Sequence, residues 1–289
     1  MFGSETSLDC SHPRIRALVR SASIEITARV SAVNELANAG LLAGAHVYIT
    51  ALPGDSANAV LATALRVRQM GLTPVPHLGA RYVAEPRQFE ALLGSLVRDA
   101  GVDQVLVIGG DIGRPRGPYP SSLALLRSGI FEQSGIRRIG LAAYPEGHPS
   151  ISGDVLEQAL VAKVACVREI GLEPYIISQF CFSAAAIIAL LSRVTRQFTG
   201  VPIHVGIAGP ASMATLVKFG LACGIGASLR TLRKTSLRQL ADATPDELVT
   251  SLAEAGDTIA ALHFFTFGGI ARTADWMRRY SPLETLADD

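Results

Sequence analysis

Leu141-Ala142-Ala143-Tyr144-Pro145-Glu146-Gly147-His148-Pro149 begins as a short apolar strand and continues directly into a polar turn. The two prolines stiffen this turn and the glycine lets it bend, so Tyr144, Glu146 and His148 are expected on a rigid loop at the carboxyl end of a strand. Residues 153–170 then show the apolar spacing of a helix. The stretch predicts one strand-loop-helix unit, whose polar groups either form a site or only cap an ordinary turn.

The same unit recurs along the chain about eight times. The expected strands cover residues 21–27, 46–50, 74–78, 104–110, 138–144, 174–181, 202–208 and 262–267. Helical spacing follows each of them, at residues 30–43, 56–70, 85–100, 121–133, 153–170, 184–196, 212–223 and 270–280. Strict alternation of this kind predicts a single (β/α)8 TIM barrel over residues 21–289, preceded by an N-terminal extension at residues 1–20. An open doubly wound sheet is the alternative, but the G-x-G-x-x-G expected after its first strand is absent from the sequence.

Residues 229–257 interrupt this rhythm and predict extra helices before the last strand. Thr244 is expected as the N-cap of one of them, with Pro245 at its first position and carboxylates in its first turn. Basic side chains precede this helix at Arg230, Arg233, Lys234 and Arg238. A solvated face is the simpler interpretation of these residues, and an anionic part of a ligand is the alternative.

Composition narrows the class of protein. Hydrophobic residues make up 49% of the 289 residues and charged residues 18%, which suits a parallel sheet that is buried on both faces. The 26 Lys and Arg balance 25 Asp and Glu, so neither nucleic acid nor an anionic membrane surface is an expected partner. Four scattered cysteines predict neither a metal site nor a disulfide framework. With no secretory signal and no apolar run of about 20 residues, we expect a soluble, cytoplasmic protein.

Active sites of TIM barrels lie at the carboxyl ends of the strands, where several polar residues are expected. Glu25 lies between Ile24 and Ile26 inside the first strand. Burial there should raise the pKa of this carboxyl group, so that it could act as a general acid; pairing with an Arg or Lys is the alternative. His204 and His263 also fall inside expected strands and are interpreted as core residues.

Asp111 follows two glycines at the end of the fourth strand, and Gln179 lies on the otherwise apolar sixth strand. A carboxylate and a carboxamide can together bind the polar edge of a flat heterocycle. The sequence contains no G-x-S-x-G elbow and no phosphate-binding loop. The set therefore favours hydride or proton transfer on a planar substrate over hydrolysis.

These motifs occur in the order found in a known family. They are Ser23-Ile24-Glu25-Ile26, Pro76-His77-Leu78, Gly110-Asp111, Ala142 to Pro149, Ser178-Gln179-Phe180 with Phe182, Gly206-Ile207, and His263-Phe264-Phe265-Thr266. Together they resemble methylenetetrahydrofolate reductase over nearly the whole barrel, and the segments around Tyr144 and Gln179 are the most specific. The resemblance implies a TIM barrel enzyme that interconverts 5,10-methylenetetrahydrofolate and 5-methyltetrahydrofolate by hydride transfer with NADH or NADPH.

The resemblance also implies roles for individual residues. Glu25 would be the general acid that protonates the folate as its five-membered ring opens. Asp111 would hold the pterin, and Gln179 would contact folate and nicotinamide. Phe180 and Ile207 match further substrate-binding positions. The positions that line the flavin in FAD-containing members match Thr50, His77, Gly110, Asp111, Tyr144, His148, Lys163 and Gln179.

Departures from the family leave undecided whether the chain binds a flavin. Gly109 stands where the family has an arginine before Gly-Asp, and Phe267-Gly268-Gly269 replaces a folate-contacting arginine, with Arg272 as the nearest substitute. Since some relatives pass hydride directly from nicotinamide to folate, the chain could work with or without FAD. Two other functions remain as alternatives: a pterin- or folate-binding barrel that transfers or carries a methyl group, and a flavin enzyme with another substrate. The direction of the reaction, the choice of NADH or NADPH, and a possible homo-oligomer are not decided by the sequence.

Overall fold

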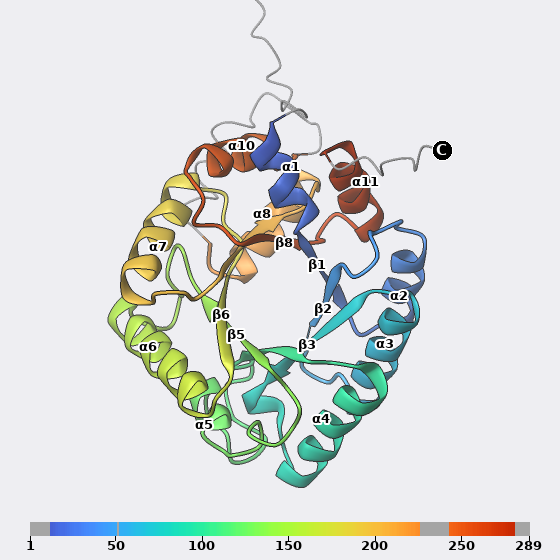
Figure 1. Cartoon of the computed structure of the whole chain (residues 1–289), viewed down its shortest axis with the longest axis vertical. Coiled ribbons are helices and arrows are strands. Elements are labelled where there is room, and N and C mark those ends of the chain that lie inside the picture. Colours follow the sequence, from blue (N-terminus) through green and yellow to red (C-terminus); the bar gives the residue numbers. More distant parts are fainter. Residues whose placement is uncertain (1–11, 51, 226–242, 281–289) are drawn as a thin grey trace, which may run out of the picture.

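A computed structural model of the chain describes residues 12–50, 52–225 and 243–280. Its eight strands are β1 (Ser23–Thr27), β2 (His46–Thr50), β3 (Thr73–Gly79), β4 (Gln104–Ile108), β5 (Arg138–Ala143), β6 (Glu173–Ser178), β7 (Ile203–Ala208) and β8 (Ala261–Phe265). All neighbouring strands are parallel, and β8 pairs with β1 to close the barrel. The predicted (β/α)8 TIM barrel is thus confirmed (Figure 1).

Helices surround the barrel, as Figure 1 shows. Their bounds are α1 (Pro13–Arg20), α2 (Val30–Ala37), α3 (Ala57–Gln69), the 3-10 helix η1 (Ala80–Tyr82), α4 (Pro86–Ala100), α5 (Ser122–Leu126), α6 (Gly153–Glu169), α7 (Ala184–Gln197), α8 (Met213–Ala222), α10 (Asp246–Glu254) and α11 (Ile270–Tyr280). No helix in the described ranges is both long and apolar enough to cross a membrane.

Three helices differ from prediction. Helix α2, expected at residues 30–43, ends at Ala37, and the other two differ for local reasons. The helix expected at residues 121–133 stops at Leu126, because Ser128 Oγ donates to the Leu125 carbonyl at 2.7 Å and Gly129 turns the chain at φ +81°. Helix α10 confirms a helix inside the insertion, but Pro245 rather than Thr244 occupies its cap position.

The basic residues Arg230, Arg233, Lys234 and Arg238 of this insertion lie outside the described residues.

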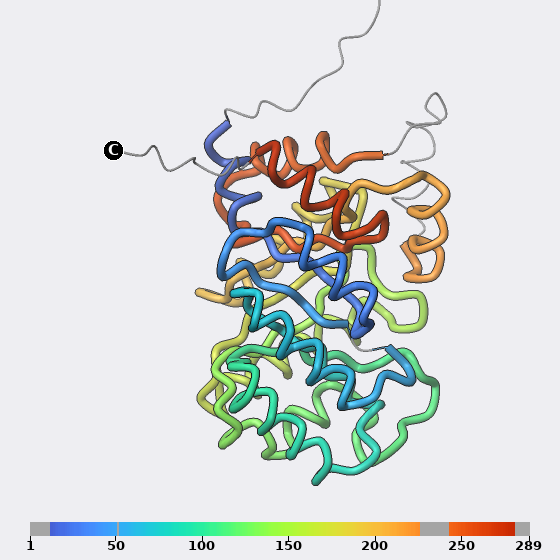
Figure 2. The backbone as a smooth tube through the Cα atoms, turned by 90° about the vertical axis from the view of Figure 1, so that its right-hand side faces the viewer, coloured from blue at the N-terminus to red at the C-terminus, as the bar shows by residue number. Residues whose placement is uncertain are grey.

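Helix α1 lies within the segment interpreted as an extension. Its Ile15, Leu18 and Val19 side chains are buried, and the helix packs against α10, α11 and β8. Arg14 adds a hydrogen bond of 2.8 Å from its guanidinium to the Ile259 carbonyl. In Figure 2, α1 lies at the upper left of the view and α8 at the right.

The interior of the barrel is filled by side chains. Tyr48, Val75, Leu106 and Tyr175 form a buried cluster there, and the Tyr48 hydroxyl donates to the Tyr175 hydroxyl at 3.1 Å. Gly140 leaves the space that Tyr175 occupies, since a Cβ atom at position 140 would lie 2.6 Å from the tyrosine ring. A filled interior leaves the strand ends as the place for ligands.

Candidate functional site

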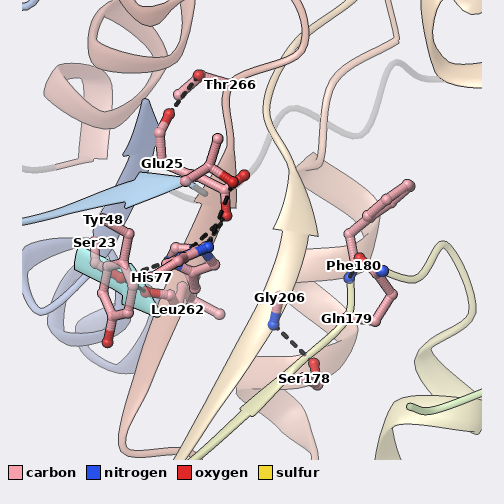
Figure 3. A network of polar contacts seen from close by, with 12 residues as sticks. Ser23, Glu25, Tyr48, His77, Ser178, Gln179, Phe180, Gly206, Leu262 and Thr266 are labelled. Carbon is pink, nitrogen blue, oxygen red and sulfur yellow. Dashed lines mark hydrogen bonds and ion pairs between the residues drawn. The ribbon is translucent and has the colours of Figure 1, made fainter. Parts of the chain in front are cut away.

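Glu25 lies at the centre of a cluster made by three strands of the barrel. Its Oε2 atom is 3.6 Å from Nε2 of His77 on β3 and 3.5 Å from Nε2 of His263 on β8. The Glu25 side chain is 17% exposed, whereas the two imidazoles are 6% and 1% exposed. These contacts are longer than tight hydrogen bonds, and neither Nε2 atom has another hydrogen-bond partner among the described residues. The cluster holds a carboxylate between two buried imidazoles (Figure 3).

Neighbouring hydroxyl groups fix the orientation of this cluster. Ser23 Oγ lies 2.9 Å from His263 Nδ1, and Thr50 Oγ1 lies 3.4 Å from His77 Nδ1. Thr266 donates to the Glu25 backbone carbonyl at 2.7 Å, as Figure 3 also shows. Ser23 and Glu25 are two residues apart on β1, so their side chains lie on the same face of the strand. Closure of the barrel brings both next to β8.

The predicted direction of the Glu25 pKa shift was wrong. Burial alone does raise the pKa of Glu25, but the polar contact with His263, the electrostatic effects of His77 and His263, and a contribution from Thr50 lower it by more. The pKa of Glu25 therefore lies below its usual value of 4.5, and the group is ionised at neutral pH. The sequence argument failed because the partners are histidines from distant strands rather than an Arg or Lys.

His77 is neutral at the same pH. Burial lowers its pKa to about 4, although the Glu25 charge opposes this change and the charge of His263 adds to it. An ionised carboxylate next to a neutral imidazole forms a resting state that can accept a proton.

Asp111 lies beyond the end of β4, and its charge acts on Tyr144 and Cys223. Burial and the Asp111 charge raise the pKa of Tyr144, and burial with the charges of Asp111 and Glu25 raises the pKa of Cys223 to about 11. The charges of Asp111 and Glu25 thus both act on Cys223, a residue that the sequence argument did not select.

Contacts among its own residues hold the loop after β5. The rings of Tyr144 and His148 meet edge to face with centroids 5.4 Å apart, and the backbone amide of Ser150 donates to His148 Nδ1 at 3.2 Å. Glu146 accepts from the Cys181 thiol, with Sγ and Oε1 3.6 Å apart. Tyr144 and His148 thus form contacts within the loop, whereas Glu146 contacts Cys181 beyond β6.

Gln179 lies at the end of β6, where the Phe180 amide donates to its Oε1 atom at 3.0 Å (Figure 3). This bond uses the carboxamide oxygen of Gln179, so the NH2 group is the part of the side chain that can donate to a ligand. Phe180 itself is 1% exposed and packs among aromatic side chains, including Phe265 and Phe267.

Two predicted site residues are buried in other parts of the fold. Ile207 is buried in the layer between strands and helices, since it follows the inward position of Gly206. Lys163 is buried within α6, and burial lowers its pKa to about 8.

Sequence reasoning missed three residues that organise the site: His263, Thr266 and Tyr82. The alternation of His263 with Phe265 along β8 could have placed this histidine inside the barrel. Tyr82 accepts the Asp111 amide hydrogen at 2.8 Å, a contact that no sequence pattern shows. Among the described residues, no group of three or more His, Cys, Asp or Glu side chains is arranged to hold a metal ion.

No protein family model matches the chain. Its fold is similar to that of dihydropteroate synthase from Thermus thermophilus. A crystal structure of that protein in complex with 6HMPPP shares 12% identity over 91% of this chain and 92% of that chain, with a TM-score of 0.49. A second crystal structure of the same protein shares 14% identity over 91% and 93%, with a TM-score of 0.48. At these identities the similarity concerns the barrel fold.

Proposed function

We propose that the chain binds a reduced folate at the carboxyl end of the barrel and interconverts 5,10-methylenetetrahydrofolate and 5-methyltetrahydrofolate with NADH or NADPH. The observation that carries this proposal is the Glu25 carboxylate held between His77 and His263. The order of the motifs along the sequence supports the choice of substrate.

Proton balance defines the role of Glu25. Reduction of the methylene group consumes one hydride and one proton, and the proton goes to the folate nitrogen released when the five-membered ring opens. Glu25 would donate this proton in the reductive direction and accept it in the oxidative direction. Since Glu25 is ionised at neutral pH, the ligand-free protein is prepared for the oxidative direction, and the reductive direction needs a prior protonation of Glu25.

The rim would hold the heterocycle. The Asp111 carboxylate can accept from ring N–H groups, and the NH2 group of Gln179 can donate to a ring carbonyl. Most of the substrate would then contact the loops after β4, β5 and β6, while its reacting nitrogen lies over Glu25.

Two of the residues expected around a flavin, His77 and Lys163, are buried. Because Lys163 is buried within α6 and Gly109 stands where an arginine was expected, we propose direct hydride transfer between nicotinamide and folate.

One observation favours a second function. A carboxylate with a lowered pKa is better suited to accept hydrogen bonds than to act as a general acid. This property suits a barrel that binds a pterin or folate for methyl transfer or carriage. Such a protein would bind folate without any dependence on nicotinamide.

The Glu25→Gln substitution tests the proposal, because it removes the ionisable group and changes little volume. We expect turnover of 5-methyltetrahydrofolate with NAD or NADP to fall by at least about 100-fold, while the folate dissociation constant changes by less than about threefold. Glu157→Gln, at an exposed position of α6, is the matched control and should leave both quantities unchanged. Unchanged turnover in Glu25→Gln would remove Glu25 from the reaction.

A further inference from the structure

Tyr82 ends the short helix η1, which follows β3 without a spacer. Its hydroxyl oxygen accepts the backbone amide hydrogen of Asp111 at 2.8 Å, across the gap between the ends of β3 and β4. This is a direct bond between an aromatic side chain and the residue expected to hold the heterocycle.

Two glycines adapt the backbone to the Tyr82 ring. A Cβ atom at Gly79 would overlap the ring, and one at Gly110 would lie 3.0 Å from it. Gly110 also has a backbone φ of +92°, a conformation that residues with a side chain rarely adopt. The glycine before Asp111 is therefore explained by the position of Tyr82.

The remainder of this loop is held by the neighbour of Tyr82. The Arg81 amide donates to the Gly109 carbonyl at 3.0 Å, and the Arg116 amide donates to the Arg81 carbonyl at 2.9 Å. The Arg81 guanidinium adds a bond of 2.9 Å to the Pro120 carbonyl. Loss of the Tyr82 hydroxyl should therefore change the conformation at Asp111 without releasing the loop.

The phenol is protonated at neutral pH and carries no competing charge. Burial raises the pKa of Tyr82, the bond from the Asp111 amide lowers it, and the Asp111 charge raises it again. A neutral hydroxyl can accept the amide hydrogen and lie close to the Asp111 carboxylate without repelling it.

We infer that Tyr82 is a positioning residue, which fixes the Asp111 backbone so that the carboxylate can receive the N–H groups of a planar heterocycle. This inference rests on the proposed function, because it names the way in which the same site recognises its substrate.

A double-mutant cycle with Tyr82→Phe and Asp111→Asn tests the inference, with 5-methyltetrahydrofolate as the probe in titration calorimetry. Tyr82→Phe alone should weaken binding about five- to tenfold, as expected for one lost hydrogen bond at a site. In the Asp111→Asn background the same change should cost less than about twofold. Equal losses in both backgrounds, or no loss in either, would overturn the inference. Tyr119→Phe, in the same loop, is the control and should bind folate like the wild type.

Hydrogen exchange at the Asp111 amide gives a measurement that does not depend on folate. Tyr82→Phe should speed this exchange about tenfold, since the amide loses its acceptor, whereas Tyr119→Phe should not. Unchanged exchange would overturn the inference even if folate binds. Faster exchange in a protein whose wild type binds no folate would instead contradict the proposed function and leave the role of Tyr82 in place.

Discussion

The Nε2 atom of His263 lies 3.5 Å from Oε2 of Glu25, a contact that forms only because the last strand of the barrel pairs with the first. After the opposing effect of burial, the polar contact with His263 is the largest influence on the Glu25 carboxyl group and lowers its pKa. The state of the proposed proton-transfer group is thus decided by barrel closure.

His263→Asn should raise the pKa of Glu25, because it removes the imidazole contact that lowers this pKa. If Glu25 accepts a proton in the oxidative direction, the acid limb of the kcat/KM profile should move to higher pH. His46→Asn, at the other end of the barrel interior, serves as the comparison and should leave that limb in place. An acid limb that stays in place in His263→Asn would show that another group controls it.

Stability should decrease as pH falls from about 6.5 to 4. Burial lowers the pKa of His77 to about 4 and that of His204 to about 3, so the unfolded chain binds protons in this window that the folded chain does not. The stabilisation is complete above the unfolded value of 6.5 and is lost as pH falls toward the folded values. We expect the free energy of unfolding to drop by about 1 kcal/mol or more per pH unit, measured by urea titration. His204→Asn should reduce this slope by about half, and an unchanged slope would argue against a buried neutral His204.

Gly140→Ala should destabilise the barrel by about 1–3 kcal/mol, since the new methyl group would lie 2.6 Å from the Tyr175 ring. Gly94→Ala is the matched control, because position 94 lies within α4 and its Cβ would meet no atom within 4 Å. That change should stabilise the protein by about 0.5–1 kcal/mol. Equal melting temperatures of the two variants would show that the barrel interior is less tightly filled than the structure indicates.

The sequence predicted the fold well, because strand-helix alternation is a local pattern that each unit displays independently. Glu25 could be selected as a candidate site residue for the same reason, since a carboxylate inside an apolar strand is conspicuous. Its histidine partners could not, because they depend on which strands become neighbours after closure. Ile207 was misplaced for a simpler reason: adjacent residues of a strand point to opposite faces, and Gly206 is the one that points inward.

The central claim is that Glu25 serves hydride transfer between folate and nicotinamide, and a single assay tests it most directly. Purified protein is mixed with 5-methyltetrahydrofolate and NAD or NADP, and formation of the reduced nicotinamide is followed by its absorbance. We predict reduced nicotinamide in the wild type without a flavin band in the spectrum, and almost none in Glu25→Gln. Folate binding without any reduced nicotinamide in the wild type would contradict the claim and would favour a barrel that binds folate for methyl transfer or carriage.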